Sequence, residues 1–61
     1  MKKNNDPLLT SRAIAARLAI TQRTLRRMIV RGEFPGPDTV LGYNMHRWRP
    51  QTLERWLAER E

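Results

Sequence analysis

The fold is decided by residues 10–32, which read TSRAIAARLAITQRTLRRMIVRG. The threonine or serine at the start can cap a helix over residues 11–18, because apolar residues then recur at helical spacing on one face. Thr21 can cap a second helix that runs to about Arg31, where the following glycine is a natural stop. Only about three residues separate the two helices, which is the connection expected of a helix-turn-helix rather than of a parallel bundle.

The apolar residues of this stretch are spaced to hold the two helices together. They are Ile14, Leu18, Ile20, Leu25, Met28 and Ile29. The small Ala15 falls where the helices approach each other. Ala19 occupies the turn, where a left-handed backbone would cost about 1 kcal/mol relative to glycine. We therefore expect the two helices to share one core across a tight turn.

The next segment predicts an extended link and a hairpin. Residues 34–37, Phe-Pro-Gly-Pro, cannot be helical, because each proline lacks an amide hydrogen and restricts the residue before it. Residues 39–41 and 46–48 are β-prone and flank residues 42–45, Gly-Tyr-Asn-Met. Glycine and asparagine are the residues that a tight reversal requires, so we expect a small hairpin.

The end of the chain predicts a third helix. Pro50 suits its first position, where the missing amide is not needed, and apolar residues then recur on one face. The predicted core is completed by Phe34, Trp48, Leu53, Trp56 and Leu57. The order helix, turn, helix, hairpin, helix predicts a winged helix-turn-helix, mainly α with a small β-hairpin, in one domain over residues 8–61. Residues 1–7 are polar and end in proline, so we expect a flexible N-terminal arm.

Length and composition exclude several classes of protein. At 61 residues the chain has room for one small domain, which buries only about 60% of the surface that its unfolded chain exposes. It has no cysteine, so neither a disulfide nor a thiolate metal site can supplement the core. No apolar run approaches the roughly 20 residues that span a bilayer, and residues 1–7 lack the apolar segment of a signal peptide. We expect a cytoplasmic protein with no metal and no cofactor.

The net charge of +6 is concentrated in the first half of the chain. Residues 1–31 hold eight lysines or arginines against one aspartate, a balance of +7, whereas residues 32–49 balance at 0 and residues 50–61 at −1. Six arginines and no acidic residue lie between Arg12 and Arg31. A surface that serves only solubility usually has positive and negative residues interspersed. The uneven distribution of charge therefore indicates a face that binds a polyanion.

The outer face of the second helix is the expected contact surface. Packing of the apolar stripe leaves outside Gln22, Arg23, Arg26, Arg27 and Val30. In the major groove of DNA, arginine can pair bidentately with guanine and glutamine with adenine. We therefore predict that Arg23 or Arg26 reads guanine and that Gln22 reads adenine. The alternative is that these side chains are only solvated and bind no ligand. That alternative would be the better interpretation for a lone arginine, but four adjacent polar positions on this face favour contact with DNA.

The hairpin adds a second set of candidate contacts. Alternation along its second strand turns Trp48 inward, and therefore Arg47 and Arg49 outward, beside the groove next to the second helix. His46 is the only histidine and cannot form a metal site by itself, so we expect it to touch phosphate or water. Tyr43, at the tip, can contact the DNA backbone or stay exposed. The full predicted set for double-stranded DNA is Thr21, Gln22, Arg23, Thr24, Arg26, Arg27, Asn44, His46, Arg47 and Arg49.

A set of motifs spans most of the chain. They are Leu8-Leu9-Thr10, Thr24-Leu25-Arg26-Arg27-Met28-Ile29, Gly32-Glu33-Phe34-Pro35-Gly36-Pro37, Leu41-Gly42, Arg47-Trp48-Arg49 and Leu53-Glu54-Arg55-Trp56-Leu57. Together they resemble the AlpA and excisionase group of small phage and prophage DNA-binding proteins, which implies a MerR-like winged fold. The chain departs from that pattern twice. Ala19 stands where such turns often have glycine, and residues 43–45 stand where relatives commonly place glycine and arginine, so the wing tip lacks a cation.

The resemblance implies two roles. One is an excisionase, or recombination directionality factor, that binds attachment-site DNA cooperatively, bends it and, with contacts to phage integrase, promotes prophage excision. The other is an AlpA-like transcriptional regulator of phage or prophage genes. A domain of this size buries only about 600 to 1,000 Å² on DNA, so head-to-tail self-association on neighbouring sites is a natural way to gain occupancy. Either role implies a nucleoid-associated protein in a bacterial host.

Two further classes of function fit the sequence less well. An enzyme would need a grouped set of reactive residues, but the six carboxylates are scattered over termini, loops and an exposed helix. They are Asp6, Glu33, Asp38, Glu54, Glu59 and Glu61. We therefore expect no enzymatic activity. A protein-interaction adaptor could dock an acidic partner or a membrane on the basic face, but a membrane binder would need an apolar stripe that the core already uses.

Overall fold

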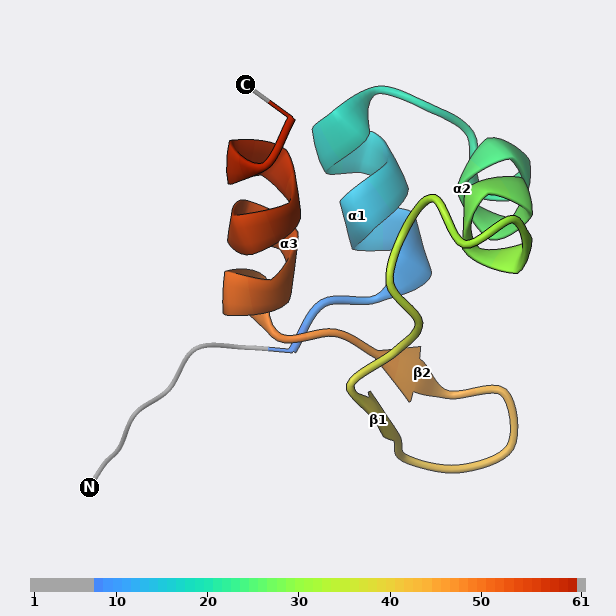
Figure 1. Cartoon of the computed structure of the whole chain (residues 1–61). Helices are drawn as coiled ribbons and strands as arrows, with labels where there is room; N and C mark the ends of the chain where they lie inside the picture. Colours follow the sequence, from blue (N-terminus) through green and yellow to red (C-terminus); the bar gives the residue numbers. More distant parts are fainter. Residues whose placement is uncertain (1–7, 61) are drawn as a thin grey trace.

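The computed structural model describes residues 8–60, so the arm expected over residues 1–7 lies outside the described residues. Helices and strands follow one another in the predicted order (Figure 1). They are α1 (Ser11–Leu18), α2 (Gln22–Val30), β1 (Thr39–Val40), β2 (His46–Arg47) and α3 (Pro50–Ala58). In Figure 1, α1 lies between α2 and α3, and the hairpin extends from one end of this helical layer. No helix within residues 8–60 is long and apolar enough to cross a membrane.

Threonine side chains cap both helices of the helix-turn-helix. The hydroxyl oxygen of Thr10 accepts a hydrogen bond from the amide of Ala13 at 3.0 Å, and that of Thr21 accepts one from the amide of Thr24 at 3.0 Å. Each bond satisfies one of the amides that a helix leaves unpaired at its N-terminus. The predicted start of each helix is therefore confirmed, and Thr10 is the cap of the first.

The turn between α1 and α2 passes through a left-handed alanine. Ala19 has φ 61° and ψ 40°. The amide of Ile20 donates to the carbonyl of Ala15 at 2.9 Å, and the amide of Ala19 donates to that of Ala16 at 3.1 Å. This pair of bonds is a Schellman motif, which normally has glycine at the left-handed position. The chain therefore carries backbone strain at the turn.

α2 ends in the same motif with glycine in place. The amide of Glu33 donates to the carbonyl of Met28 at 2.8 Å, and the amide of Gly32 donates to that of Ile29 at 3.0 Å. Gly32 has φ +80° and confirms the predicted stop of the helix. The two helices thus end in matched backbone geometries that differ in one side chain, alanine at position 19 and glycine at position 32.

The hairpin is shorter than predicted. Its antiparallel pairs are Thr39 with Arg47 and Val40 with His46. Leu41 and Trp48, which we expected in the strands, lie outside them. Trp48 instead pairs with Leu9, whose amide donates to the Trp48 carbonyl at 2.7 Å and whose carbonyl accepts from the Trp48 amide at 2.9 Å. Trp48 leaves the ladder because its backbone groups bind the segment before α1.

The predicted reversal at the hairpin tip is confirmed. The amide of Met45 donates to the carbonyl of Gly42 at 3.0 Å, and the amide of Leu41 donates to that of Met45 at 2.9 Å. Asn44 takes a positive φ of 59°, a conformation that asparagine tolerates better than most residues. The tip therefore projects Tyr43, 92% exposed, into solvent.

One core holds these elements together. Its buried residues are Ile14, Ala15, Leu25, Phe34, Trp48 and Leu53. The partly buried residues that pack against them are Leu9, Leu18, Ile20, Met28, Ile29, Trp56 and Leu57. Every predicted core residue is in one of the two sets, while Leu9 was not predicted. Six of the predicted residues are only partly buried, because a domain this small has little interior.

The two tryptophans of the core pack against Phe34 and also satisfy their indole nitrogens. The ring of Phe34 meets Trp48 edge to face at 6.4 Å and Trp56 at 4.9 Å between ring centroids. The indole nitrogen of Trp48 donates to the carbonyl of Pro35 at 2.9 Å, and that of Trp56 donates to the carbonyl of Glu33 at 2.9 Å. Both tryptophans therefore pack in the core and fasten the link after α2, which supports the expected packing role.

A residue from the base of the hairpin caps α3. α3 begins at Pro50, as predicted, and its N-cap Arg49 makes no side-chain capping bond. Asp38 supplies the cap: its carboxylate accepts from the amide of Arg49 at 2.8 Å and from the hydroxyl of Thr52 at 2.7 Å. These two bonds, the Arg49 amide first, hold the pKa of Asp38 below its ordinary value. Since Asp38 directly precedes β1, the contact fixes the hairpin against α3.

Candidate nucleic-acid interface

α2 turns one face to solvent, and this face is polar except for Val30 at its end. Leu25 is fully buried on the opposite side, and Met28 and Ile29 pack beside it against the core. The five residues predicted to face outward are all exposed: Gln22, Arg23, Arg26, Arg27 and Val30. The hydrophobic pattern of α2 therefore sets the orientation that the sequence predicts.

A hollow of about 510 Å³ lies between this face and the hairpin. It is lined by Ser11, Gln22, Arg23, Arg26, Ile29, Val30, Pro37, Asn44, His46 and Trp48. Five of the predicted contact residues are thus brought together, three from α2 and two from the hairpin. Residues three and four positions apart share one side of a helix, which explains why Gln22, Arg23 and Arg26 line it together.

Among residues 8–60, those that line the hollow carry positive charge and no carboxylate. None of its lining residues is acidic. Within residues 8–60, an ion pair joins Arg17 of α1 to Glu54 of α3, with 3.1 Å between nitrogen and oxygen. The arginines of α2 are not part of this ion pair. Asp38 is engaged with the start of α3. Arg23 and Arg26 therefore present full positive charge to a ligand in the hollow, which favours a polyanion.

Three predicted residues of the α2 region do not line the hollow: Thr21, Thr24 and Arg27. The hydroxyl of Thr21 accepts from the Thr24 amide and donates to the Thr24 hydroxyl at 2.9 Å. Thr21 is therefore occupied as a cap, whereas the hydroxyl of Thr24 retains a hydrogen that it can donate. Arg27 is exposed and does not line the hollow. Thr24 and Arg27 therefore lie where they could contact the phosphate backbone of a nucleic acid bound in the hollow.

Of the two arginines beside Trp48, which were both predicted to point outward, only Arg49 is exposed. Trp48 points inward and is 1% exposed, as expected. Arg49 is exposed, but Arg47 is half-buried, and its guanidinium donates to the carbonyl of His46 at 2.8 Å. The prediction that both arginines point outward is therefore only partly right, because the long Arg47 side chain folds back on its own strand. Neither arginine lines the hollow.

Sequence reasoning assigned no structural role to Asp38. Its partners Arg49 and Thr52 are distant in the chain, so no helical or strand period connects them. The available signal was indirect: Arg49 is a poor N-cap residue, so a helix that starts at Pro50 requires its capping acceptor from elsewhere. Asp38 positions the hairpin that supplies Asn44 and His46 to the hollow.

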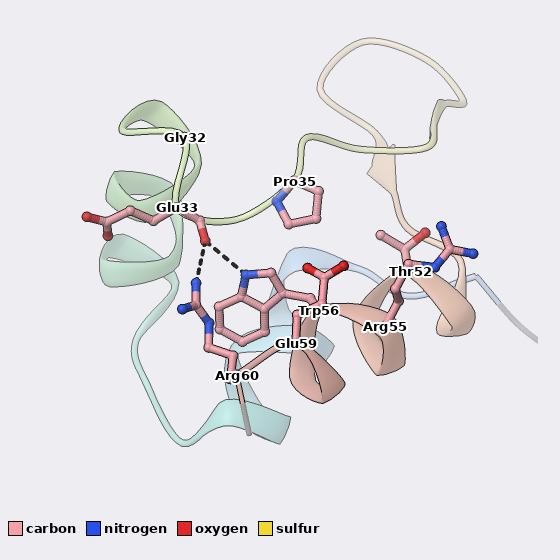
Figure 2. A pocket seen from close by; sticks show the side chains of 8 residues that line it. All are labelled: Gly32, Glu33, Pro35, Thr52, Arg55, Trp56, Glu59 and Arg60. Carbon is pink, nitrogen blue, oxygen red and sulfur yellow. Dashed lines mark hydrogen bonds between the residues drawn. The ribbon is translucent and has the colours of Figure 1, made fainter.

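A second hollow, of about 520 Å³, lies between α3 and the link after α2, and Figure 2 shows its lining side chains. The carbonyl of Glu33 accepts hydrogen bonds from Trp56 and, at 3.1 Å, from Arg60, whose guanidinium carbon lies 4.2 Å from the centre of the Trp56 ring. Arg55 and Glu59 also line it, so its charges are mixed. In the described part of the chain, no cluster of three or more histidine, cysteine or acidic residues could hold a metal ion. The α2 hollow is the better candidate for a polyanion.

Comparison with known families agrees with this geometry. A family model described as a helix-turn-helix domain matches residues 8–61. Its match extends over both helices of the motif, the hairpin and α3. No match was found among curated proteins or among solved structures.

Proposed function

Because the chain belongs to the helix-turn-helix domain family, we propose that it binds a specific double-stranded DNA sequence with α2 in the major groove. The observation that carries this proposal is the hollow between α2 and the hairpin, where arginines that have no carboxylate partner within residues 8–60 lie beside polar groups that can read base edges. A major groove about 12 Å wide admits one α-helix, and the hairpin then lies against the adjacent backbone.

The residues of the hollow divide by what their chemistry can recognise. Arg23 and Arg26 can each make two parallel hydrogen bonds to guanine, and Gln22 can make two to adenine. Asn44 and His46, on the hairpin, would contact the sugar-phosphate backbone at the edge of the groove. These backbone contacts would fix the register of α2 without specifying sequence.

The outer positions can add phosphate contacts. Arg27 and Arg49 are exposed outside the hollow, and the Thr24 hydroxyl can donate a hydrogen bond. Arg47 can contribute through the guanidinium N–H groups that its single bond to the carbonyl of His46 leaves free. Contacts of this type supply affinity that falls steeply as the salt concentration rises.

Selection from a random duplex pool, followed by titration at several salt concentrations, tests the proposal. We expect one preferred sequence and a linear fall of log affinity with log salt, with a slope of about −0.9 per phosphate neutralised. Arg26→Ala should lower affinity by about 1 to 3 kcal/mol and relax preference at one base pair. Arg55→Ala removes the same charge from α3 and should leave the preference unchanged. Wild-type affinity in both Arg23→Ala and Arg26→Ala would remove α2 from the interface.

We propose further that the protein acts as an excisionase of a phage or prophage. The motifs that resemble the AlpA and excisionase group support this role, and so does the small size of the domain. An interface of about 600 to 1,000 Å² is small for high occupancy by one copy, which favours cooperative binding to neighbouring sites. Copies arranged head to tail on attachment-site DNA would bend it and, together with integrase, favour excision.

The second candidate role is transcriptional regulation, which the same resemblance supports. Two assays separate the roles. An excisionase should shift a long attachment-site fragment in cooperative steps and should be required for excision by integrase. A regulator should instead bind as isolated copies and change expression from a phage or prophage promoter, with excision unaffected. Absence of salt-dependent duplex binding would contradict both roles and favour an adaptor that binds an acidic protein.

A further inference from the structure

An apolar residue follows the two arginines of α2, Arg23 and Arg26, that line the hollow. Val30, the last residue of the helix, is 81% exposed and lines the same hollow as Arg23 and Arg26. It follows Arg26 by four positions and Arg23 by seven, so the three side chains lie in one row along the helix. The row thus offers two cationic groups and then an apolar one.

Neither folding nor helix stability accounts for valine at this position. An 81% exposed side chain contributes little to the core, which the neighbouring Ile29 contacts instead. Valine is also a weaker helix former than alanine, lysine or glutamate, any of which would suit an exposed helix position better. Its stiff χ1 torsion holds two methyl groups in place, so little side-chain entropy is lost when they are covered.

The geometry gives Val30 a specific partner on DNA. In the major groove thymine presents a methyl group, and apolar side chains are the groups that contact it. At 1.5 Å per residue, seven positions place Val30 about 10 Å along the helix from Arg23. Successive bases rise about 3.4 Å, so the two side chains reach bases roughly three pairs apart when α2 follows the groove.

We propose that Val30 is a specificity-determining residue that reads the 5-methyl group of a thymine, within about three base pairs of the base that Arg23 contacts. The inference rests on the proposed function, because α2 must lie in the major groove. It adds a base preference that a row of arginines and glutamine does not supply. Contact between Val30 and the methyl group removes water from both apolar surfaces. It requires no change in the hydrogen bonds between the polar side chains of α2 and the bases.

Deoxyuridine lacks only this methyl group, so it provides the test. In the site selected by the wild-type protein, each thymine is replaced in turn by deoxyuridine, and affinities are measured for wild type and Val30→Ala. Wild type should lose about fourfold at one thymine, the factor that corresponds to one methyl group removed from water. Val30→Ala should bind the two duplexes with equal affinity, and Val30→Thr, which keeps one methyl group, should retain part of the difference.

A matched control is Val40→Ala on β1, since Val40 is also exposed, at 55%, but does not line the hollow. It should keep the whole fourfold difference, and the melting curve of each variant checks that the fold is intact. The inference is overturned if wild type shows no loss at any thymine, if the selected site has none, or if Val30→Ala keeps the same loss. Failure of the wild type to prefer any duplex would overturn the proposed function itself, and the Val30 inference with it.

Discussion

Replacement of Ala19 by glycine should stabilise the domain. Ala19 has the left-handed φ of 61°, which costs an L-residue with a side chain roughly 1 to 2 kcal/mol. Glycine removes this strain but loses about 0.4 to 1 kcal/mol through the greater freedom of the unfolded chain. Ala19 is exposed, so no packing is lost. The net gain is about 0.5 to 1 kcal/mol, which for a domain of this size corresponds to roughly 2 to 8 °C in Tm.

Thermal and urea unfolding, followed by tryptophan fluorescence, measure this gain, and α2 provides the matched control. Gly32 occupies the same place in the second Schellman motif, with φ +80°, and a Cβ added there would meet no atom within 4 Å. Gly32→Ala should therefore lower stability by a similar amount through backbone strain alone. If Ala19→Gly lowers the Tm, or if both substitutions leave it unchanged, the assignment of strain to these two turns is wrong.

Three further predictions concern the core, the cap of α3 and the interface. Trp56→Ala should lower the free energy of unfolding by about 3 kcal/mol, because it removes contact with Phe34 and leaves the carbonyl of Glu33 with fewer donors; an unchanged urea midpoint would contradict the core assignment. The pKa of Asp38 is lowered in the folded state, so its contribution to stability is present above the unfolded value of about 3.9 and is lost as the pH falls through the lower folded value. Asp38→Ala should therefore cost about 1 kcal/mol at neutral pH and flatten the acid limb of a pH-stability curve; an unaltered acid limb would exclude this cap. Arg27→Ala should weaken binding to all duplexes alike and reduce the salt slope by about 1, measured by titration, whereas a changed sequence preference would show that Arg27 reads a base.

The helices of this fold can be predicted from sequence because their signals are local. Thr10 and Thr21 lie three residues before the amides that they cap, and Gly32 follows directly on the last turn of α2. Pro50 marks the start of α3 in the same way. Each signal acts within one helical turn, so no knowledge of tertiary structure is needed to recognise it.

Sequence patterns predict which residues enter the core, but not two contacts that join distant segments of the chain. Leu9 pairs with Trp48 across most of the chain, and Asp38 caps a helix that begins well beyond it. Such pairs have no period in the sequence. They also explain the error in the hairpin, because the β-propensity of Trp48 is satisfied by the segment before α1 rather than by β1.

The candidate site was also predicted only in part from the sequence. The amphipathic pattern of α2 predicts which residues face outward, and all five are exposed. It does not predict which side of that face the hairpin approaches. The hollow includes Arg26 and leaves out Arg27, a distinction that depends on where the fold places Asn44 and His46. Val30 was likewise recognised as outward but had no assigned role until the hollow grouped it with the arginines.

The choice of residues on α2 is unfavourable for the free protein and favourable for a complex with DNA. Arg23 repels Arg26 and Arg27 at helical spacing, each pair by a few tenths of a kcal/mol. The first turn of α2 also has no acidic residue, which would offset this repulsion and interact favourably with the positive end of the helix dipole. On α1, by contrast, Arg17 is paired with Glu54. Phosphates beside α2 would relieve both terms, so a duplex that binds only the folded chain stabilises it, by about 2.7 kcal/mol at 100 times Kd. The six buried residues in the described part of the chain leave little stability in reserve. Much of the stability of this domain on its target would therefore come from the DNA itself.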